Sequence, residues 1–300
     1  MRRLNFRGIL RQLALQLFLL AVTAFVMFPI LWIVSLALDP RNIDKPLELR
    51  LIPPGASFHA FRKIIFEPFR LLCKNPSDLS TCMTFPKLLL NSLLVSLGTS
   101  VIAVVLGASA AYAFSRFQFI GRQAGMLGFI VLLMLPSAAT LAPLYVLLSQ
   151  IKIGGEPLRA PLPGLMIAYG SGALPFSIWN LKGYFDTVPR ELEEAALIDG
   201  ASRLAVFRHI IIPLSAPAIA VTILFGFMSG WTEFVLAWTF LENPSRFTLA
   251  MALRAMQGQF ATPWSEFAAL SILMSIPVVL LFFGLQRYIV SGLSMGAVKG

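Results

Sequence analysis

Residues 189–213 read PRELEEAALIDGASRLAVFRHIIIP and carry the clearest local signals in the chain. Pro189 suits the first position of a helix, and Gly200 can adopt the left-handed conformation that ends one. Acidic side chains lie near the positive end of the dipole of this helix: Glu191, Glu193 and Glu194. The segment therefore predicts a short helix, a sharp turn and a second helix.

One face of the first predicted helix carries mostly small side chains and is neither strongly apolar nor strongly charged. Helical spacing places together Leu192, Ala195, Ala196 and Asp199. Two alanines beside an acid suit a knob that enters a pocket of a soluble partner better than a surface buried in lipid. A solvated loop with ordinary helix capping explains the same residues equally well, so local chemistry leaves both interpretations open.

The composition places the rest of the chain in a membrane. Of 300 residues, 57% are hydrophobic and 13% are charged, and the mean hydropathy is +0.80. So much apolar surface cannot be hidden in one water-soluble core, which predicts an all-α integral membrane protein. The net charge of +10 does not indicate nucleic acid, because the 24 Lys and Arg are scattered between apolar segments.

Apolar stretches of sufficient length predict six transmembrane helices, at 13–38, 87–115, 124–149, 164–182, 214–240 and 266–289. The polar remainder consists of an N-terminus, 1–12, a first outer loop, 39–86, an inner loop, 183–212, an outer loop, 241–263, and a C-terminal tail, 290–300. The core of the fold is expected over 87–289. An even number of spans places both termini on one side of the membrane.

The distribution of basic residues favours cytoplasmic termini. Four arginines precede the first span, Arg2, Arg3, Arg7 and Arg11, and two more, Arg116 and Arg122, occupy the short connection after the second. The total count is equal on the two sides and does not decide the orientation. The first apolar run is too long for the core of a signal peptide. Arg2-Arg3 could belong to a twin-arginine signal, but no small-residue cleavage site follows the run, so a retained anchor is expected.

Several spans contain residues that suggest a path or close packing. Interior prolines are Pro29, Pro136, Pro143, Pro175, Pro217 and Pro277, and breaks at such positions survive in lipid only beside other helices or a wet cavity. Small residues in the second span, such as Gly107, allow the backbones of neighbouring helices to approach closely. Ordinary helix packing is sufficient to explain them. Glu233 and Trp231 either border a solute path, or Glu233 serves a structural ion pair or a helix end.

Cys73 and Cys82 both lie in the first outer loop. An oxidising compartment there permits a disulfide, and two free thiols are the alternative.

The spacing within 194–213 resembles the EAA motif of binding-protein-dependent ABC importer permeases. The matching pattern is Glu194-Ala195-Ala196, three residues, Gly200, nine residues, Ile210, one residue and Ile212-Pro213. Ile212 departs from the leucine that is usual in the family. The resemblance implies a type I importer permease fold with cytoplasmic termini and a coupling helix that docks on an ATPase subunit. Coupling roles fall on Glu194, Ala195, Ala196, Asp199, Gly200, Ile210 and Pro213.

The resemblance extends to maltose-type permeases over most of the chain, through Ala111–Arg116, Lys182–Phe185, Thr232-Glu233 and the tail 292–300. It implies a carbohydrate importer, with oligosaccharides of the maltose type as the expected solutes, in a bacterial inner membrane. The expected partners are a second permease subunit, two ATP-binding subunits that hold ATP and Mg, and an extracytoplasmic solute-binding protein. Lys299 and Gly300 should contact the ATPase, and 241–263 should reach the binding protein.

The motifs of catalysis are absent from the sequence. No phosphate-binding loop, His-Glu-x-x-His or Cys-x-x-Cys string occurs, so no catalytic residue, metal site or cofactor is predicted in this chain. Gly292-x-Ser294-x-Gly296 matches a hydrolase nucleophile pattern, but only four residues follow it. An importer of another sugar or a polyol-phosphate, an ion-driven carrier and a membrane-embedded enzyme remain the alternatives.

Overall fold

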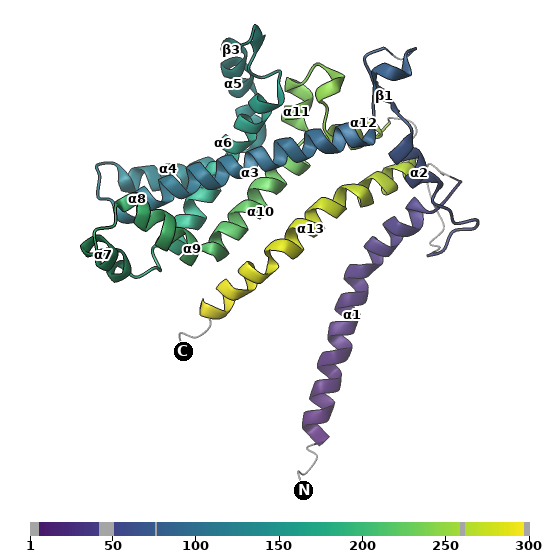
Figure 1. Cartoon of the computed structure of the whole chain (residues 1–300). Helices are drawn as coiled ribbons and strands as arrows, with labels where there is room; N and C mark the ends of the chain where they lie inside the picture. The colour runs from purple at the N-terminus through teal and green to yellow at the C-terminus, as the bar shows by residue number, and fades with distance from the viewer. Residues whose placement is uncertain (1–5, 42–50, 76, 259–261, 297–300) are drawn as a thin grey trace. The chain divides into compact units, whose positions relative to one another are not determined.

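The computed structural model describes residues 6–41, 51–75, 77–258 and 262–296. It divides into two compact units, one of Met1–Glu67 with Met256–Ser275 and the other of Pro68–Ala255 with Ile276–Gly300. Figure 1 labels the α-helices of both units.

The first unit contains α1 (Phe6–Ala37), α2 (His59–Phe66) and the first turns of α13 (Trp264–Gly296). Ser265 Oγ donates to the carbonyl of Asp39 at 2.7 Å, and Lys63 Nζ lies 2.6 Å from Glu266 Oε1. These contacts join the segment after α1, the helix α2 and the start of α13. Most apolar side chains of α1 between Leu10 and Val34 are exposed, as expected of a helix whose surroundings are lipid or another chain.

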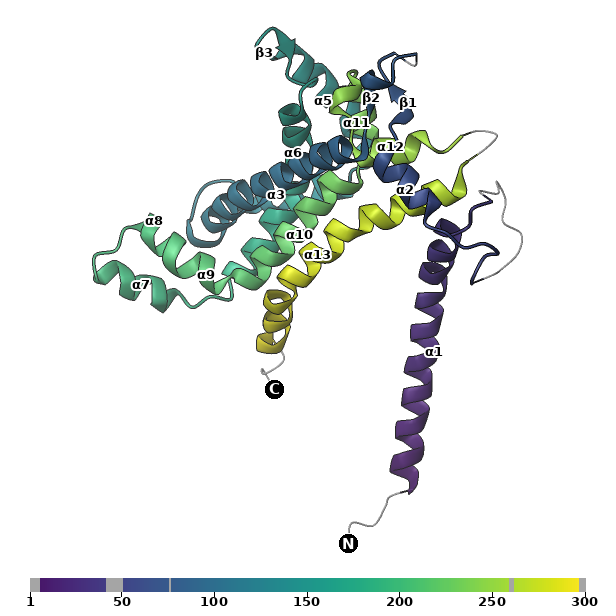
Figure 2. The same ribbon diagram turned by 45° about the vertical axis from the view of Figure 1, so that its right-hand side comes forward.

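Three helices form the centre of the second unit: α3 (Phe85–Arg116), α6 (Leu162–Phe185) and α10 (Ala216–Thr232). They lie side by side in both ribbon views (Figures 1 and 2). A Cβ added to Gly230 of α10 would lie 2.8 Å from Cα of Ser96, and one added to Gly107 of α3 would lie 2.8 Å from Cβ of Ser177. Close packing of these helices therefore explains why the predicted second span contains small residues.

Two of the predicted spans are broken. The stretch 124–149 forms α4 (Arg122–Met134) and α5 (Ser137–Gln150), which are bent by 108°. Pro136, which lacks an N–H group and favours an extended preceding residue, stands at the break, and Leu135 is extended. The stretch 214–240 forms α10 and α11 (Val235–Phe240), which separate at Glu233.

The connection before α10 is also segmented. It contains α7 (Arg190–Ile198), α8 (Arg203–Val206), a π-helical turn labelled η2 (Phe207–Ile211) and α9 (Ile212–Leu214). The stretch Arg203–Leu214 meets α10 at 82°.

Two small hairpins qualify the all-α prediction. In the first, β1 (Phe69–Cys73) pairs with β2 (Cys82–Met83) around η1 (Leu79–Thr81), and a disulfide joins Cys73 to Cys82. In the second, β3 (Lys152–Ile153) pairs with β4 (Glu156–Pro157) through Gly154-Gly155, both at positive φ.

The segment after α11 is held against α3. It contains η3 (Pro244–Arg246) and α12 (Leu249–Ala255), and the first four residues of α12 are buried. Asn91 Nδ2 donates to the carbonyl of Phe247 at 2.9 Å, and the amide of Leu249 donates to Ser92 Oγ at 2.7 Å. Most of the predicted outer loop 241–263 is thus ordered on the second unit.

Three helical stretches in the described residues are long and apolar enough to cross a membrane: Leu10–Ala37, Phe85–Arg116 and Trp264–Ile289. Counting each bent pair as one span raises the number to five. The prediction of a helical membrane protein is confirmed. The predicted span 164–182 lies in α6, which is not among these five.

We expect Gly230→Val to destabilise the packing of α10 on α3, because the new side chain would meet backbone atoms of Ser96. Overpacking of this kind costs about 1–3 kcal/mol or more. Thermal unfolding of the detergent-solubilised protein measures the effect. Gly128→Val on α4 is the matched control, since no atom lies within 4 Å of its added Cβ; equal melting temperatures for the two variants would contradict the expectation.

We expect Cys73 and Cys82 to resist maleimide labelling until a reductant is added, because their sulfur atoms are joined in a disulfide. A short loop closed in this way gains about 2–4 kcal/mol. Mass spectrometry of the 68–87 peptide reads out the pairing, with the double variant Cys73→Ser/Cys82→Ser as control. Labelling of the untreated protein would contradict it.

Candidate functional site

The predicted helix-turn-helix is confirmed in α7 and the residues after it. Gly200 has φ of +86°. Its amide donates to the carbonyl of Leu197 at 3.1 Å, and the amide of Ala201 donates to that of Ala196 at 3.0 Å. This pair of bonds is the Schellman pattern that ends a helix and needs a left-handed residue. Pro189 stands one residue earlier than predicted, at the N-cap.

The predicted docking face of α7 lies on the surface of the second unit. Leu192, Ala195 and Asp199 are exposed, as is Glu194, while Ala196 is half-buried. Larger apolar side chains beside this face are also open, with Ile198 86% and Leu204 73% exposed. Apolar groups left open on a polar segment mark a surface for another macromolecule.

The second half of the segment turns inward. The amide of Ile212 donates to the carbonyl of Phe207, which closes the π-helical turn. Ile210 is half-buried and Ile211 packs with residues of α3 and α6 such as Ala111 and Leu181. Pro213, which has no N–H to give, follows the turn and is exposed. Ile210 and Ile211 therefore belong to the part that fixes the segment on the protein, whereas Pro213 lies on its exposed side.

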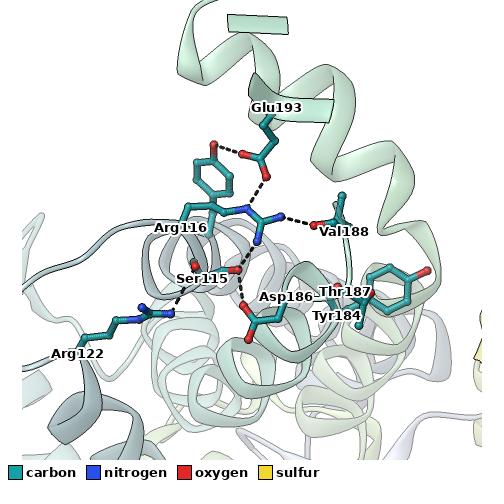
Figure 3. A network of polar contacts seen from close by, with 9 residues as sticks. Ser115, Arg116, Arg122, Tyr184, Asp186, Thr187, Val188 and Glu193 are labelled. Carbon is teal, nitrogen blue, oxygen red and sulfur yellow. Dashed lines mark hydrogen bonds and ion pairs between the residues drawn. The ribbon is translucent and has the colours of Figure 1, made fainter. Parts of the chain in front are cut away.

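A polar network joins α7 to the end of α3 (Figure 3). Arg116 Nε bonds the carboxylate of Glu193, and Tyr112 donates to the same carboxylate at 3.0 Å. Arg116 Nη2 donates to the carbonyl of Val188 at 3.0 Å, and Nη1 donates to Ser115 Oγ at 2.9 Å. The side chains of Arg116 and Glu193 are only 7% and 10% exposed, so the ion pair is buried.

A second carboxylate extends the network. Ser115 Oγ donates to Asp186 Oδ1 at 2.6 Å (Figure 3). Lys182 pairs with the other oxygen of the same carboxylate. Partial burial raises the pKa of the Asp186 carboxyl, but the bonds from Lys182 and Ser115 outweigh it, and the pKa lies below its usual value. Arg122 Nε donates to the carbonyl of Phe114 at 2.7 Å, which ties the start of α4 to the end of α3.

Sequence reasoning missed the pairing of Arg116 with Glu193. It used Arg116 for membrane orientation and Glu193 for the helix dipole. No local signal distinguishes Glu193 from Glu191 and Glu194, because all three acids occupy the first turns of α7 and each could equally face water.

A cavity of about 910 Å³ lies where the two broken helices meet α6. The breaks after α4 and after α10 both border it. Its wall is mostly apolar, with polar groups from Thr140, Tyr169, Ser171, Ser229, Thr232 and Glu233. Non-helical backbone at membrane depth is tolerated where it lines a cavity, which fits both breaks.

The structure separates the two residues predicted to border a solute path. Glu233 lines the cavity, and its carboxylate accepts the amides of Val235 at 2.8 Å and Leu236 at 3.1 Å. It therefore also caps α11, as the helix-end interpretation predicted. Trp231 is 3% exposed, stacks on Phe227 and is not part of the cavity lining.

The remaining predicted residues lie at or near the C-terminus. Lys299 and Gly300 lie outside the described residues. The Gly292-x-Ser294-x-Gly296 string lies within α13, so it has a helical conformation rather than the strand-to-helix turn of a hydrolase elbow.

Residues 103–295 match the family described as binding-protein-dependent transport system inner membrane component. The match covers the second half of α3 from residue 103 on, all of α4 to α12 and nearly all of α13. The chain belongs to this family of transport permeases. The resemblance predicted from the 194–213 spacing is confirmed, and the permease is a multi-pass inner-membrane component of an ABC transport system.

Two sugar permeases are similar to this chain over nearly their full length. The trehalose transport system permease protein SugB of Mycobacterium tuberculosis is 36% identical, with 93% of this chain and 94% of the relative covered. The maltose/maltodextrin transport system permease protein MalG of Salmonella typhimurium is 33% identical, with 97% of each covered. One solved structure with the same fold is the crystal structure of a bacterial ABC transporter involved in the import of the acidic polysaccharide alginate. One of its chains superposes with a TM-score of 0.71 and 19% sequence identity, and the comparison covers 96% of this chain and 98% of that chain.

We expect Gly200→Val to open the end of α7 in the permease, because a β-branched residue at φ of +86° is strained by about 1–2 kcal/mol. Hydrogen exchange of the backbone amides at positions 200 and 201 should become about tenfold faster. Gly200→Asn is the control, since asparagine tolerates the left-handed conformation. Unchanged protection in the valine variant would contradict the assignment.

Proposed function

We propose that this chain is the permease subunit of an ATP-driven importer that moves a carbohydrate, an oligosaccharide of the maltose type, across the inner membrane by alternating access. The observation that carries the proposal is the similarity, over more than nine-tenths of both chains, to permeases named for trehalose and for maltose and maltodextrin.

The proposal includes six spans with both termini in the cytoplasm. Five spans are the three long helices, the bent pair of α4 and α5, and α10 with α11, while Arg203–Leu214 stays on the cytoplasmic side. The sixth is α6, which has 24 residues, a length of about 36 Å, and a single charge near its end. Eleven of its residues are buried, chiefly against α3 and α10. A helix shielded from lipid in this way tolerates the glycines, serines and Asn180 that lower its hydropathy.

The exposed face of α7 would then dock on an ATP-binding subunit. Two such subunits would bind ATP and Mg, a second permease subunit would complete the membrane part, and a solute-binding protein would deliver the sugar from outside. Glu194 and Asp199 offer carboxylates to basic groups of the ATPase, and Ala195 permits close approach. The open Ile198 and Leu204 supply apolar contact area.

The cavity at the helix breaks is the part of this chain that we place beside the solute path. Its mixed lining suits a sugar, whose ring faces are apolar and whose hydroxyls need hydrogen-bond partners. Glu233 is its charged member. Trp231 lies in the core next to it and serves packing.

The deciding experiment is reconstitution of the permease with its ATPase, second permease and binding protein in lipid vesicles. ATP turnover and uptake are measured with trehalose, maltodextrins, a polyol-phosphate and no solute. Stimulation of both by an oligosaccharide supports the proposal. Stimulation only by a polyol-phosphate would change the substrate class, and uptake driven by an ion gradient without ATP would replace the proposal with a secondary carrier.

We expect Glu233→Gln to lower sugar uptake several-fold, because the amide keeps one acceptor for the α11 amides but loses the charge in the cavity. Hydrogen bonds to a charged group are stronger than neutral ones by about 1 kcal/mol. Uptake kinetics in the vesicles provide the measurement, with Glu67→Gln as a control because Glu67 is an exposed acid outside the cavity. Unchanged uptake together with unchanged ATP coupling would end this role for Glu233.

A further inference from the structure

We infer that the buried Arg116–Glu193 ion pair, together with Tyr112, is the positioning link through which α7 transmits movement to α3. The inference rests on the proposed function and assigns a role to residues outside the 194–213 motif. Neither side chain reaches the exposed docking face, so they act through the position of α7.

The geometry of Arg116 makes the link directional. Its guanidinium group bonds three separate positions: the carboxylate of Glu193 in α7, the carbonyl of Val188 just before α7, and the hydroxyl of Ser115 in α3. The planar fork fixes these bonds relative to one another. Rotation or sliding of α7 on the end of α3 would break several charge-assisted bonds at once, so the two elements should move as one body.

Aromatic contacts extend the link to the second half of the segment. The ring of Tyr112 lies 4.9 Å from that of Phe207, in the π-helical turn, and 5.9 Å from that of Phe117. The guanidinium of Arg203 lies 5.4 Å above the Phe117 ring. Both halves of the segment are thereby held on the same end of α3.

Stability alone is a weak reason for a buried ion pair here. Desolvation of two charges offsets much of their attraction, and apolar residues of similar volume often stabilise a fold equally well. A directional contact is what apolar residues cannot supply. Because α3 also packs along α6 and α10, whose residues line the cavity, a displacement of α3 reaches the proposed solute path.

The test uses the complete reconstituted complex with four variants: Glu193→Gln, Arg116→Met, Arg116→Lys and the apolar double variant Arg116→Met/Glu193→Leu. Glu156→Gln is the control, because it removes a partly exposed ion pair with Arg246 elsewhere in the chain. Subunit assembly, basal ATP turnover, solute-stimulated ATP turnover and uptake per ATP are measured for each.

We expect Glu193→Gln and Arg116→Met to lose at least tenfold in solute-stimulated turnover, with basal turnover within twofold of the unaltered complex. The binding-protein concentration for half-maximal stimulation should stay unchanged, because docking outside is intact. Arg116→Lys, which keeps the charge without the fork, should fall between. The double variant should assemble as well as the control and remain uncoupled.

Recovery of coupling in the double variant would show that burial alone suffices and would overturn the inference. So would stimulated turnover within twofold in the single variants, or failure of every variant to assemble, which would assign the pair to folding. Failure of the proposed function is distinguishable, because the unaltered complex would then show no ATP-driven sugar uptake.

Discussion

The close approach of α3 to α6 and α10 is the constraint on which the second unit depends. Lipid offers no hydrophobic drive between helices, so their association relies on van der Waals contact and on hydrogen bonds such as that from Ser100 to the carbonyl of Ile223. Contact at this distance requires glycine where backbone meets backbone, as at Gly230. With α3 fixed between its neighbours, one of its ends can hold the α7–α9 connection and the other can hold α12.

A second constraint explains where the helices break. An interrupted helix in a bilayer exposes polar backbone groups that lipid cannot satisfy. Here the breaks at Pro136 and at Glu233 open onto one cavity, and the carboxylate of Glu233 binds two of the freed amides. The same acid therefore repairs the backbone and gives the cavity its charge. A residue with these two tasks is less replaceable than either task alone implies.

The candidate site could be predicted from the sequence to the extent that it depends on local geometry. Gly200 was identified correctly because helix termination needs a left-handed residue within one turn, and the mild face of α7 followed from helical spacing. The pairing of Glu193 with Arg116 could not be predicted, because 77 residues separate the two and either charge could equally have faced water. Trp231 was placed beside a path on the strength of its neighbour in sequence, whereas successive helical residues point in different directions.

The sequence by itself determined that this protein is a helical membrane protein, because its apolar content cannot be buried in water, and that it carries the permease signature between α7 and α9. It also determined where helices can end, since Pro136 and Gly200 restrict the backbone locally. Only the tertiary structure decided that the two broken helices border one cavity and that Glu193 turns inward while Glu194 remains exposed. The physical reason is that desolvation and pairing of a charge depend on which helices approach it in space, and neighbours along the chain do not specify that approach.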